Sequence, residues 1–265
     1  MTFYSWREAP VADYAVVGFP VKHSLSPRMH QAAYSALGIQ ASYVAIEIAP
    51  EEFVEGVEHL AAIGFRGINI TIPHKESAFR WAASTCEISK KLQVCNTLRF
   101  SDRSGVNTDV PGFLRSLPGH SPSALVLGAG GSARAVAYAL ARQGTEVSVW
   151  NRTRSRAEEL VEQVGLGCRV ALEASIKGFG LIVNTTSTGL SGESLPIDWS
   201  GVDADSQLAY DLAYSDAPTP FLTDAALHGL TGIDGRRMLM EQGAFAFEYW
   251  FDRPAPREAM WEAIQ

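Results

Sequence analysis

The sequence has few of the features that mark secreted, membrane-spanning or zinc-binding proteins. Its 265 residues include three cysteines, Cys86, Cys95 and Cys168, with no CxxC pair and no Cys/His cluster at ligand spacing. Three cysteines cannot all pair, which suits a reducing compartment and predicts no metal site. The first residues, MTFYSWREAP, lack the apolar core of a signal peptide, and no uninterrupted apolar run is long enough to span a membrane. We therefore expect a cytoplasmic protein.

Positive charge is also scarce. The chain carries 22 Lys and Arg against 29 Asp and Glu, a net charge of -7. A surface for nucleic acid or for an anionic membrane needs clustered cations to neutralise phosphates, so neither partner is expected. Because 46% of the residues are apolar, the chain can bury a substantial core. We expect a small-molecule ligand, bound by a monomer or a homodimer.

What the chain does contain is a repeated alternation of short β-branched runs with longer amphipathic stretches, which is typical of βαβ units. Expected strands lie at 14–18, 42–48, 67–73, 124–127, 145–150, 181–185 and 208–212, with a hairpin over 96–105. One expected helix begins after an N-cap at Ser26 and ends at Gly38. Others cover 50–64, 131–143 and 218–228, and two more follow Met238 and Pro256. The fold class is therefore α/β, with mostly parallel sheets.

Residues 118–123 concentrate turn formers without periodicity, which predicts a domain junction. We expect a first α/β domain over 1–117, joined by the C-terminal helices of 238–265, and a second α/β domain over 118–237. The aromatic residues in GAFAFEYWF, after Gln242, are expected to pack rather than to stack on a ligand.

A glycine turn between a strand and a helix opens the second domain. In ALVLGAGGSARAVAYALARQG, the GxGxxG/A positions are filled by Gly128, Gly130 and Ala133. Gly128 permits the tight turn, Gly130 lets the backbone approach a pyrophosphate, and the helix N-terminus donates N–H groups to it. Glycine turns also form ordinary strand-to-helix connections, so the elements on either side must decide whether this one binds a dinucleotide. The strand–turn–helix context predicts a Rossmann-type, doubly wound dinucleotide domain.

The residues at the end of the next strand indicate whether the dinucleotide is NAD or NADP. An NAD enzyme would carry a carboxylate there for the ribose 2'-hydroxyl. Here the chain reads Asn151, Arg152, Thr153, Arg154, Ser155, Arg156. A neutral Asn with nearby guanidinium groups favours a 2'-phosphate, so the expected cofactor is NADP. Alternatively the arginines are solvated at a helix start, although cations there oppose the helix dipole.

The first domain carries candidate substrate groups. Ser24 and Ser26 stand at a helix N-terminus, where two hydroxyls could bind a carboxylate or could simply cap the helix. In GINITIPHK, Asn69 and Thr71 share one side of a strand, and Lys75 follows the strand's carboxyl end, where ligands bind in open α/β sheets. A lysine there could protonate or stabilise a developing alkoxide, or it could be an ordinary solvated residue.

Two NT dipeptides follow, Asn96 with Thr97 and Asn107 with Thr108, the second leading into Asp109. Their side chains could bind ring hydroxyls, or they could be turn residues and caps. An Asp beside Lys75 would hold the ammonium in place and couple the two titrations.

Together these motifs resemble the shikimate dehydrogenase family. The shared set, in order, is HSLSP, GINITIPHK, CNT, GVNTD, GAGGSARA, NRTRSRA, NTTSTG, DLAY and MLMEQ. The match runs from about Tyr14 to past Gln242. The resemblance implies an enzyme that uses NADPH to reduce 3-dehydroshikimate reversibly to shikimate in aromatic amino-acid synthesis, in a cleft between a substrate domain and an NADP domain.

The resemblance also implies residue roles. Lys75 and Asp109 would form the catalytic pair. Substrate would be bound by Ser24, Ser26, Asn69, Thr71, Asn96, Tyr214 and Gln242. The cofactor would be held by Gly128, Ala129, Gly130, Gly131, Ser132, Ala133, Asn151, Arg152, Thr153, Arg156, Thr186 and Gly235. Two segments depart from the usual pattern: Gln93–Cys95, where the family has smaller residues, and Asp234–Arg237, with its two arginines.

Two other functions fit parts of the pattern. One is a quinate or quinate/shikimate dehydrogenase that oxidises its substrate and often accepts NAD, against which Arg152 and Arg156 argue. The other is a non-catalytic module that binds NADPH or another ligand without turnover. Loss of Lys75 or Asp109 would have indicated such a module, and both residues are present.

Overall fold

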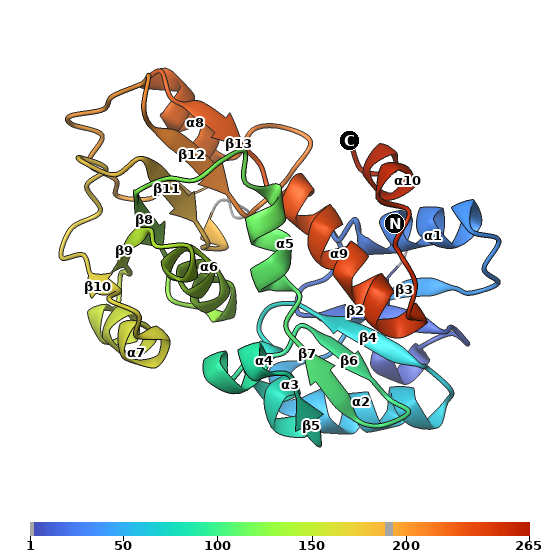
Figure 1. The fold of residues 1–265 in the computed structure, drawn as a ribbon. Coiled ribbons are helices and arrows are strands. Elements are labelled where there is room, and N and C mark those ends of the chain that lie inside the picture. The colour runs from blue at the N-terminus through green and yellow to red at the C-terminus, as the bar shows by residue number, and fades with distance from the viewer. Residues whose placement is uncertain (1–2, 189–192) are drawn as a thin grey trace. The chain divides into compact units, whose positions relative to one another are not determined.

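The computed structural model describes residues 3–188 and 193–265, and Figure 1 shows its ribbon. The chain divides into two compact units, one of Met1–Gly112 with Leu239–Gln265 and the other of Phe113–Met238. The two boundaries fall inside the helices α5 (Asp109–Ser116) and α9 (Arg236–Phe251). Gly189, the last residue of the NTTSTG motif, lies outside the described residues. None of the described helices is long and apolar enough to cross a membrane.

The first unit is built on a seven-stranded sheet with the strand order β1-β3-β2-β4-β6-β7-β5. The strands are β1 (Phe3–Ser5), β2 (Tyr14–Gly18), β3 (Tyr43–Glu47), β4 (Gly67–Ile70), β5 (Ser84–Thr85), β6 (Thr97–Arg99) and β7 (Ser104–Val106). Strands β1 to β4 pair in parallel, and β6 runs antiparallel to β4 and β7. The predicted α/β class and the predicted hairpin are confirmed.

Helices cover both faces of this sheet. They are α1 (Ser26–Ala36), α2 (Phe53–Ala62), α3 (Lys75–Trp81), α4 (Glu87–Leu92), α9 (Arg236–Phe251) and α10 (Arg257–Glu262), with short 3-10 turns at Trp6–Glu8 and Pro50–Glu52. Alternate residues of β2 point to opposite faces of the sheet. Ala15 and Val17 pack in the cluster that includes α2, and Tyr14 and Val16 pack in the cluster of α1, α9 and α10. A strand buried on both faces is apolar throughout, as the YAVVG run is.

The aromatic side chains of α9 belong to this packing. Phe247 stacks on Phe251 with ring centroids 4.6 Å apart, and Trp250 lies 4.6 Å from the ring of Tyr14. The Trp250 indole N–H donates to the backbone oxygen of Leu98 at 3.0 Å. The prediction that these aromatic residues pack the core is confirmed.

The second unit has a six-stranded sheet that is parallel throughout, in the order β10-β9-β8-β11-β12-β13. The strands are β8 (Ser123–Leu127), β9 (Glu146–Trp150), β10 (Arg169–Val170), β11 (Leu181–Asn184), β12 (Leu208–Asp211) and β13 (Thr231–Ile233), and the helices are α6 (Gly131–Arg142), α7 (Arg154–Val164) and α8 (Pro220–Leu227). The strand order reverses at β8, which pairs with β9 on one side and β11 on the other. In open α/β sheets, ligands bind at the carboxyl ends of the strands beside such a reversal.

Several short elements differ from the sequence-based expectation. The first strand of the chain is β1, which precedes the predicted first strand and pairs with β3 at the sheet edge; three residues are too few to show a period. Strands β5, β10 and β13 were not predicted either, for the same reason. Ser26 is the first residue of α1 and not its N-cap. Leu25 occupies that position, and the Ser26 N–H donates to Ser24 Oγ at 3.3 Å.

His30 makes the stability of the first unit depend on pH. It is fully buried on α1, stacked on Tyr43 with ring centroids 4.4 Å apart, and burial lowers its pKa from 6.5 to about 3. The unfolded chain therefore binds one proton more than the folded chain between these two values, so stability rises with pH in that window and falls as the solution is acidified. Each pH unit below 6.5 costs about 1.4 kcal/mol from this group.

We expect a drop from pH 7 to pH 5 to lower the free energy of unfolding by about 2 kcal/mol through His30 alone. Denaturant unfolding at both pH values, on the wild type and on His30→Leu, measures this. The variant should lose that part of the pH dependence. The contribution of His74, whose pKa burial also lowers, is common to both proteins and cancels. Equal losses in the two proteins would rule out His30 as the source.

Candidate active site

A buried ion pair lies past the carboxyl end of β4. Lys75 is the first residue of α3 and Asp109 the first residue of α5, and Lys75 Nζ donates to Asp109 Oδ2 at 2.7 Å. The two side chains are 10% and 5% exposed. The backbone holds the lysine in place, since the Cys95 N–H donates to the Lys75 carbonyl at 3.0 Å. Two charges withdrawn from water in this way stabilise each other only while both are present.

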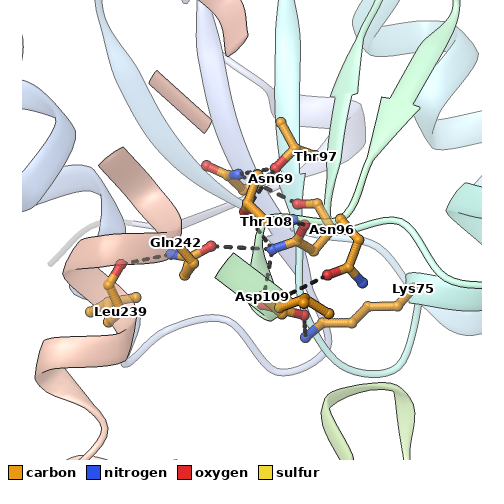
Figure 2. Close-up of polar contacts among 10 residues, drawn as sticks. Asn69, Lys75, Asn96, Thr97, Thr108, Asp109, Leu239 and Gln242 are labelled. Atoms are coloured by element: carbon orange, nitrogen blue, oxygen red, sulfur yellow. Dashed lines mark hydrogen bonds and ion pairs between the residues drawn. The ribbon is translucent and has the colours of Figure 1, made fainter. Parts of the chain in front are cut away.

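Asn96 connects this pair to its surroundings, as Figure 2 shows. Its Nδ2 donates to Asp109 Oδ1 and to Thr108 Oγ1, both at 2.9 Å, and lies 3.3 Å from Gln242 Oε1. Its Oδ1 accepts from the Thr108 N–H at 2.7 Å. Both oxygens of the Asp109 carboxylate therefore accept hydrogen bonds, one from Asn96 and one from Lys75. An ionised carboxylate is an acceptor only, so this arrangement suits the charged form.

A second amide, that of Asn69 on β4, extends the network. Its Nδ2 donates to Thr97 Oγ1 at 3.0 Å and to the Asn96 carbonyl at 3.4 Å, and its Oδ1 accepts from the Tyr43 hydroxyl at 2.7 Å. Asn69, Asn96 and Thr97 are all buried. Thr71 lies one residue past the end of β4 and is half-buried, and its methyl group faces Gly18 on β2.

The structure thus brings five of the predicted residues into one network in the first unit: Asn69, Lys75, Asn96, Asp109 and Gln242 (Figure 2). Gln242, on α9, also donates from Nε2 to the Leu239 carbonyl at 2.8 Å. Ser24 and Ser26 lie at the N-terminus of α1, joined by their own hydrogen bond. Tyr214 follows β12 in the second unit, where it is half-buried.

The glycine turn of the second unit has the geometry that a pyrophosphate requires. Gly128 has φ +112°, which residues with a side chain rarely adopt, and a Cβ there would lie 2.5 Å from Thr185 Oγ1. Gly130 is the N-cap of α6, and a Cβ there would meet nothing within 4 Å. The space beside Gly130 therefore needs no glycine for packing within the protein, which fits an approaching ligand. Ala133, fully buried, lets α6 pack closely on the sheet.

The residues after β9 suit an anionic group. Asn151 Nδ2 donates to the Thr153 carbonyl at 2.8 Å, which shapes the turn before α7. Arg154 forms an ion pair with Glu158 at 2.8 Å, one turn further along α7. Arg152 and Arg156 are exposed and make no ion pair with the residues that the structure describes. Among the described residues, these two guanidinium groups are therefore available to an anionic ligand at the start of α7.

Two further residues were predicted to hold the cofactor. Thr186 donates from its N–H and its hydroxyl to Asn184 Oδ1, at 3.0 and 2.8 Å, at the carboxyl end of β11. Gly235 follows β13, and a Cβ there would lie 2.0 Å from the Leu212 carbonyl oxygen. Gly235 is thus required by close packing of two backbone segments, whatever else it contacts. Its neighbour Arg236 pairs with Asp234 and donates to the Ser215 carbonyl at 2.7 Å.

In each unit, part of the buried polar network was not predicted from the sequence. Tyr43 was interpreted only as part of a strand, and nothing in a single sequence signals that its hydroxyl reaches β4. In the second unit, the fully buried Asp211 accepts from Thr219 at 2.6 Å, from Asn184 at 3.0 Å and from the Ala213 N–H at 2.9 Å. Burial raises the pKa of this carboxyl group. The motifs NTTSTG and DLAY were the available signal, because each supplies one member of this cluster.

Known families match three segments of the chain, and known proteins match nearly all of it. Residues 16–98 match the family described as Shikimate dehydrogenase substrate binding domain, residues 116–187 match Shikimate / quinate 5-dehydrogenase, and residues 235–265 match Shikimate 5'-dehydrogenase C-terminal domain. A shikimate dehydrogenase (NADP(+)) of Brucella abortus is 42% identical, over 94% of this chain and 92% of its own.

Solved structures give the same relationship. A shikimate 5-dehydrogenase from Thermus thermophilus, in complex with NADP(H) and shikimate, superposes with a TM-score of 0.84 at 37% identity, over 96% of this chain and 98% of that one. A 5-ketofructose reductase of Gluconobacter, in ligand-free form, has a TM-score of 0.80 at 25% identity, over 96% and 98% of the two chains. With 42% identity to a curated relative over most of its length, the chain belongs to the shikimate dehydrogenase family.

Proposed function

We propose that this protein is an NADP-dependent shikimate dehydrogenase, which reduces 3-dehydroshikimate reversibly to shikimate. The observation that carries the proposal is the buried pair of Lys75 and Asp109, framed by amide groups past the carboxyl end of β4. The same chain has a Rossmann-type unit with a glycine turn open to a pyrophosphate. Membership of the family supports both assignments. Its substrate and cofactor are small molecules, and we place its activity in the cytoplasm, as a monomer or a homodimer.

The catalytic step needs a proton at the oxygen that becomes the alcohol. NADPH, when bound, supplies the hydride to the carbonyl carbon. Lys75 presents its ammonium group to the carbonyl oxygen, stabilises the charge that develops there and delivers the proton. Asp109 holds that ammonium at 2.7 Å and keeps it aligned, while Asn96 fixes the carboxylate from its other oxygen. In the oxidation direction Lys75 accepts the proton of the substrate hydroxyl.

Substrate binding is assigned to polar groups of the first unit and to Tyr214 of the second. The serines at the N-terminus of α1, Ser24 and Ser26, offer hydroxyls to the substrate carboxylate, and the helix dipole favours an anion there. Asn69, Thr71, Asn96 and Gln242 contact ring hydroxyls or the carboxylate, and Tyr214 completes the substrate-binding set. Each is a short polar side chain or a hydroxyl with the hydrogen-bonding capacity that a polyol ring requires.

The cofactor is held by the second unit. The backbone from Gly128 to Ala133, at the start of α6, receives the pyrophosphate, and Thr186 past the end of β11 and Gly235 past the end of β13 contribute to the same binding set. Asn151, Arg152, Thr153 and Arg156 hold the adenosine end. Backbone N–H groups at a helix N-terminus bind phosphate oxygens, and planar guanidinium groups bind a 2'-phosphate through two hydrogen bonds.

The test is the absorbance of reduced nicotinamide with purified protein and four combinations: shikimate or quinate, each with NADP or NAD. We expect fast reduction only with shikimate and NADP. Equal rates with quinate or with NAD would move the function to the quinate branch of the family. No turnover in any combination would contradict an enzymatic role and favour a module that binds the dinucleotide without catalysis.

A further inference from the structure

Tyr43 reaches the candidate substrate site from a strand that does not adjoin it. In the sheet, β2 lies between β3 and β4, with Tyr43 opposite Tyr14 and Asn69 opposite Val16. An offset of two residues keeps both side chains on the same face. The Tyr43 side chain therefore crosses β2, and its hydroxyl donates to Asn69 Oδ1 at 2.7 Å in a fully buried hydrogen bond.

The ring that carries this hydroxyl is held on its face. The imidazole of His30 lies parallel to it, with an interplanar angle of 3° and ring centroids 4.4 Å apart. The Trp250 ring lies 6.4 Å from it. Tyr43 is 5% exposed, so the hydroxyl cannot exchange Asn69 for water without disturbing the packing.

This contact determines how the Asn69 amide is oriented. With Oδ1 accepting from Tyr43, the two N–H groups of Nδ2 face Thr97 Oγ1 at 3.0 Å and the Asn96 carbonyl at 3.4 Å (Figure 2). An amide has two N–H donors, and both are used. A flipped amide would take away the oxygen that accepts the Tyr43 hydroxyl proton and would set Oδ1 against the Asn96 carbonyl, which can only accept. Buried polar groups left without partners are unfavourable, so one orientation dominates.

From this geometry we propose that Tyr43 is a positioning residue for substrate recognition: its hydroxyl locks the Asn69 amide so that Asn69 offers the substrate only an acceptor oxygen. This inference rests on the proposed function, in which Asn69 contacts a ring hydroxyl. It selects ligands that donate a hydroxyl proton at this position. Tyr43 itself acts through Asn69, and its effect is on substrate affinity rather than on the reacting atoms.

The chain offers a matched control in Tyr34. This residue is also fully buried, also lies against His30, and has a hydroxyl without a hydrogen-bond partner among the described residues. Tyr43→Phe and Tyr34→Phe therefore each remove one buried hydroxyl from neighbouring rings, and only the first breaks a contact with Asn69.

Steady-state kinetics of the two variants with shikimate and NADP test the proposal. In Tyr43→Phe we expect the KM for shikimate to rise about three- to tenfold, the scale of one buried neutral hydrogen bond. We expect kcat to change less than twofold and the KM for NADP not to change, because the lost interaction serves ground state and transition state alike. In Tyr34→Phe all three constants should stay at wild-type values. An unchanged KM for shikimate in Tyr43→Phe, or an equal rise in Tyr34→Phe, overturns the proposal.

A double-mutant cycle separates action through Asn69 from a general packing effect. On an Asn69→Ala background, Tyr43→Phe should add nothing further to the KM for shikimate; additive effects overturn the proposal. If Tyr43→Phe does not fold, the kinetics of Thr97→Val test the proposal instead. It removes the acceptor on the other side of the Asn69 amide and should raise the same KM with kcat retained, and a wild-type KM in that variant counts against the lock.

A measurement on the free protein keeps this proposal apart from the proposed function. The side-chain NH₂ signals of Asn69, identified by their loss in Asn69→Ala, should shift and exchange faster with water in Tyr43→Phe and stay unchanged in Tyr34→Phe. A wild type that fails to turn over shikimate would refute the function while this signal still reports on the lock. Unaltered Asn69 signals in Tyr43→Phe would refute the lock in an active enzyme.

Discussion

Replacing Lys75 by Ala is expected to lower kcat by about 10² or more, with the KM for NADP unchanged. A positioned acid or base contributes about 10² to 10⁴ to a rate, and Lys75 is the cation that is held by Asp109 beside the amide network. The lysine is buried and fixed at 2.7 Å from one carboxylate oxygen, so water does not replace it with the same geometry. Initial rates with saturating shikimate and NADP give kcat directly.

Two controls make this result interpretable. Lys90→Ala removes an exposed lysine that pairs with Glu87 at 2.7 Å on a helix surface, and it should leave kcat unchanged. Removing Lys75 also leaves Asp109 buried without its counter-ion, at a cost on the order of 3–5 kcal/mol in stability. Unfolding curves of Lys75→Ala therefore accompany the kinetics, so that rates are compared at temperatures where the variant is folded. A folded Lys75→Ala protein with wild-type kcat would remove the catalytic role from this lysine.

The longer strands were predictable because each shows a clear pattern. YAVVG and ALVLG are apolar runs buried on both faces, TEVSVW alternates buried with more exposed residues, and the three lie within a residue of β2, β8 and β9. The three-residue strands β6 and β7 were predicted from the turn between them. Short strands without such a turn, such as β1 and β10, were not predictable, because pairing with a neighbour defines them and their own composition does not. The start of α1 was misplaced by one residue, since Leu25 and not Ser26 occupies the N-cap.

Contacts between distant residues were the least accessible part of the site. Asn96 and Gln242 are 146 positions apart, and their proximity depends on α9 packing on the first unit. A single sequence contains no signal for such a pair, so the expectation came from resemblance to a family. Tyr43 makes another contact that the sequence does not predict. Its motif, SYVAIEI, indicates only a strand, and the hydrogen bond to Asn69 follows from the register of three strands and from the crossing of β2.

The preference for NADP over NAD should depend on Arg152 and Arg156, the two arginines after β9 that form no ion pair with the residues that the structure describes. In the double variant Arg152→Ala with Arg156→Ala, we expect the KM for NADP to rise by about 10- to 100-fold, while the KM for NAD changes less than threefold. A charge-assisted hydrogen bond contributes about 1.5–3 kcal/mol, but both side chains are exposed and screened by solvent, so we expect the two together to contribute about as much as one such bond. NAD has no 2'-phosphate to lose. Initial rates with each cofactor at saturating shikimate measure the two constants.

Arg154 provides the matched control for this pair. It lies between the two arginines in the sequence, but its guanidinium group is already bound to Glu158 at 2.8 Å. Arg154→Ala removes the same charge from the same turn and should leave the ratio of the two KM values unchanged. Since all three arginines carry the same charge, an equal effect of Arg154→Ala would mean that the general positive potential of the turn, and not two specific contacts, selects NADP. A change confined to the double variant identifies Arg152 and Arg156 as the groups that read the 2'-phosphate.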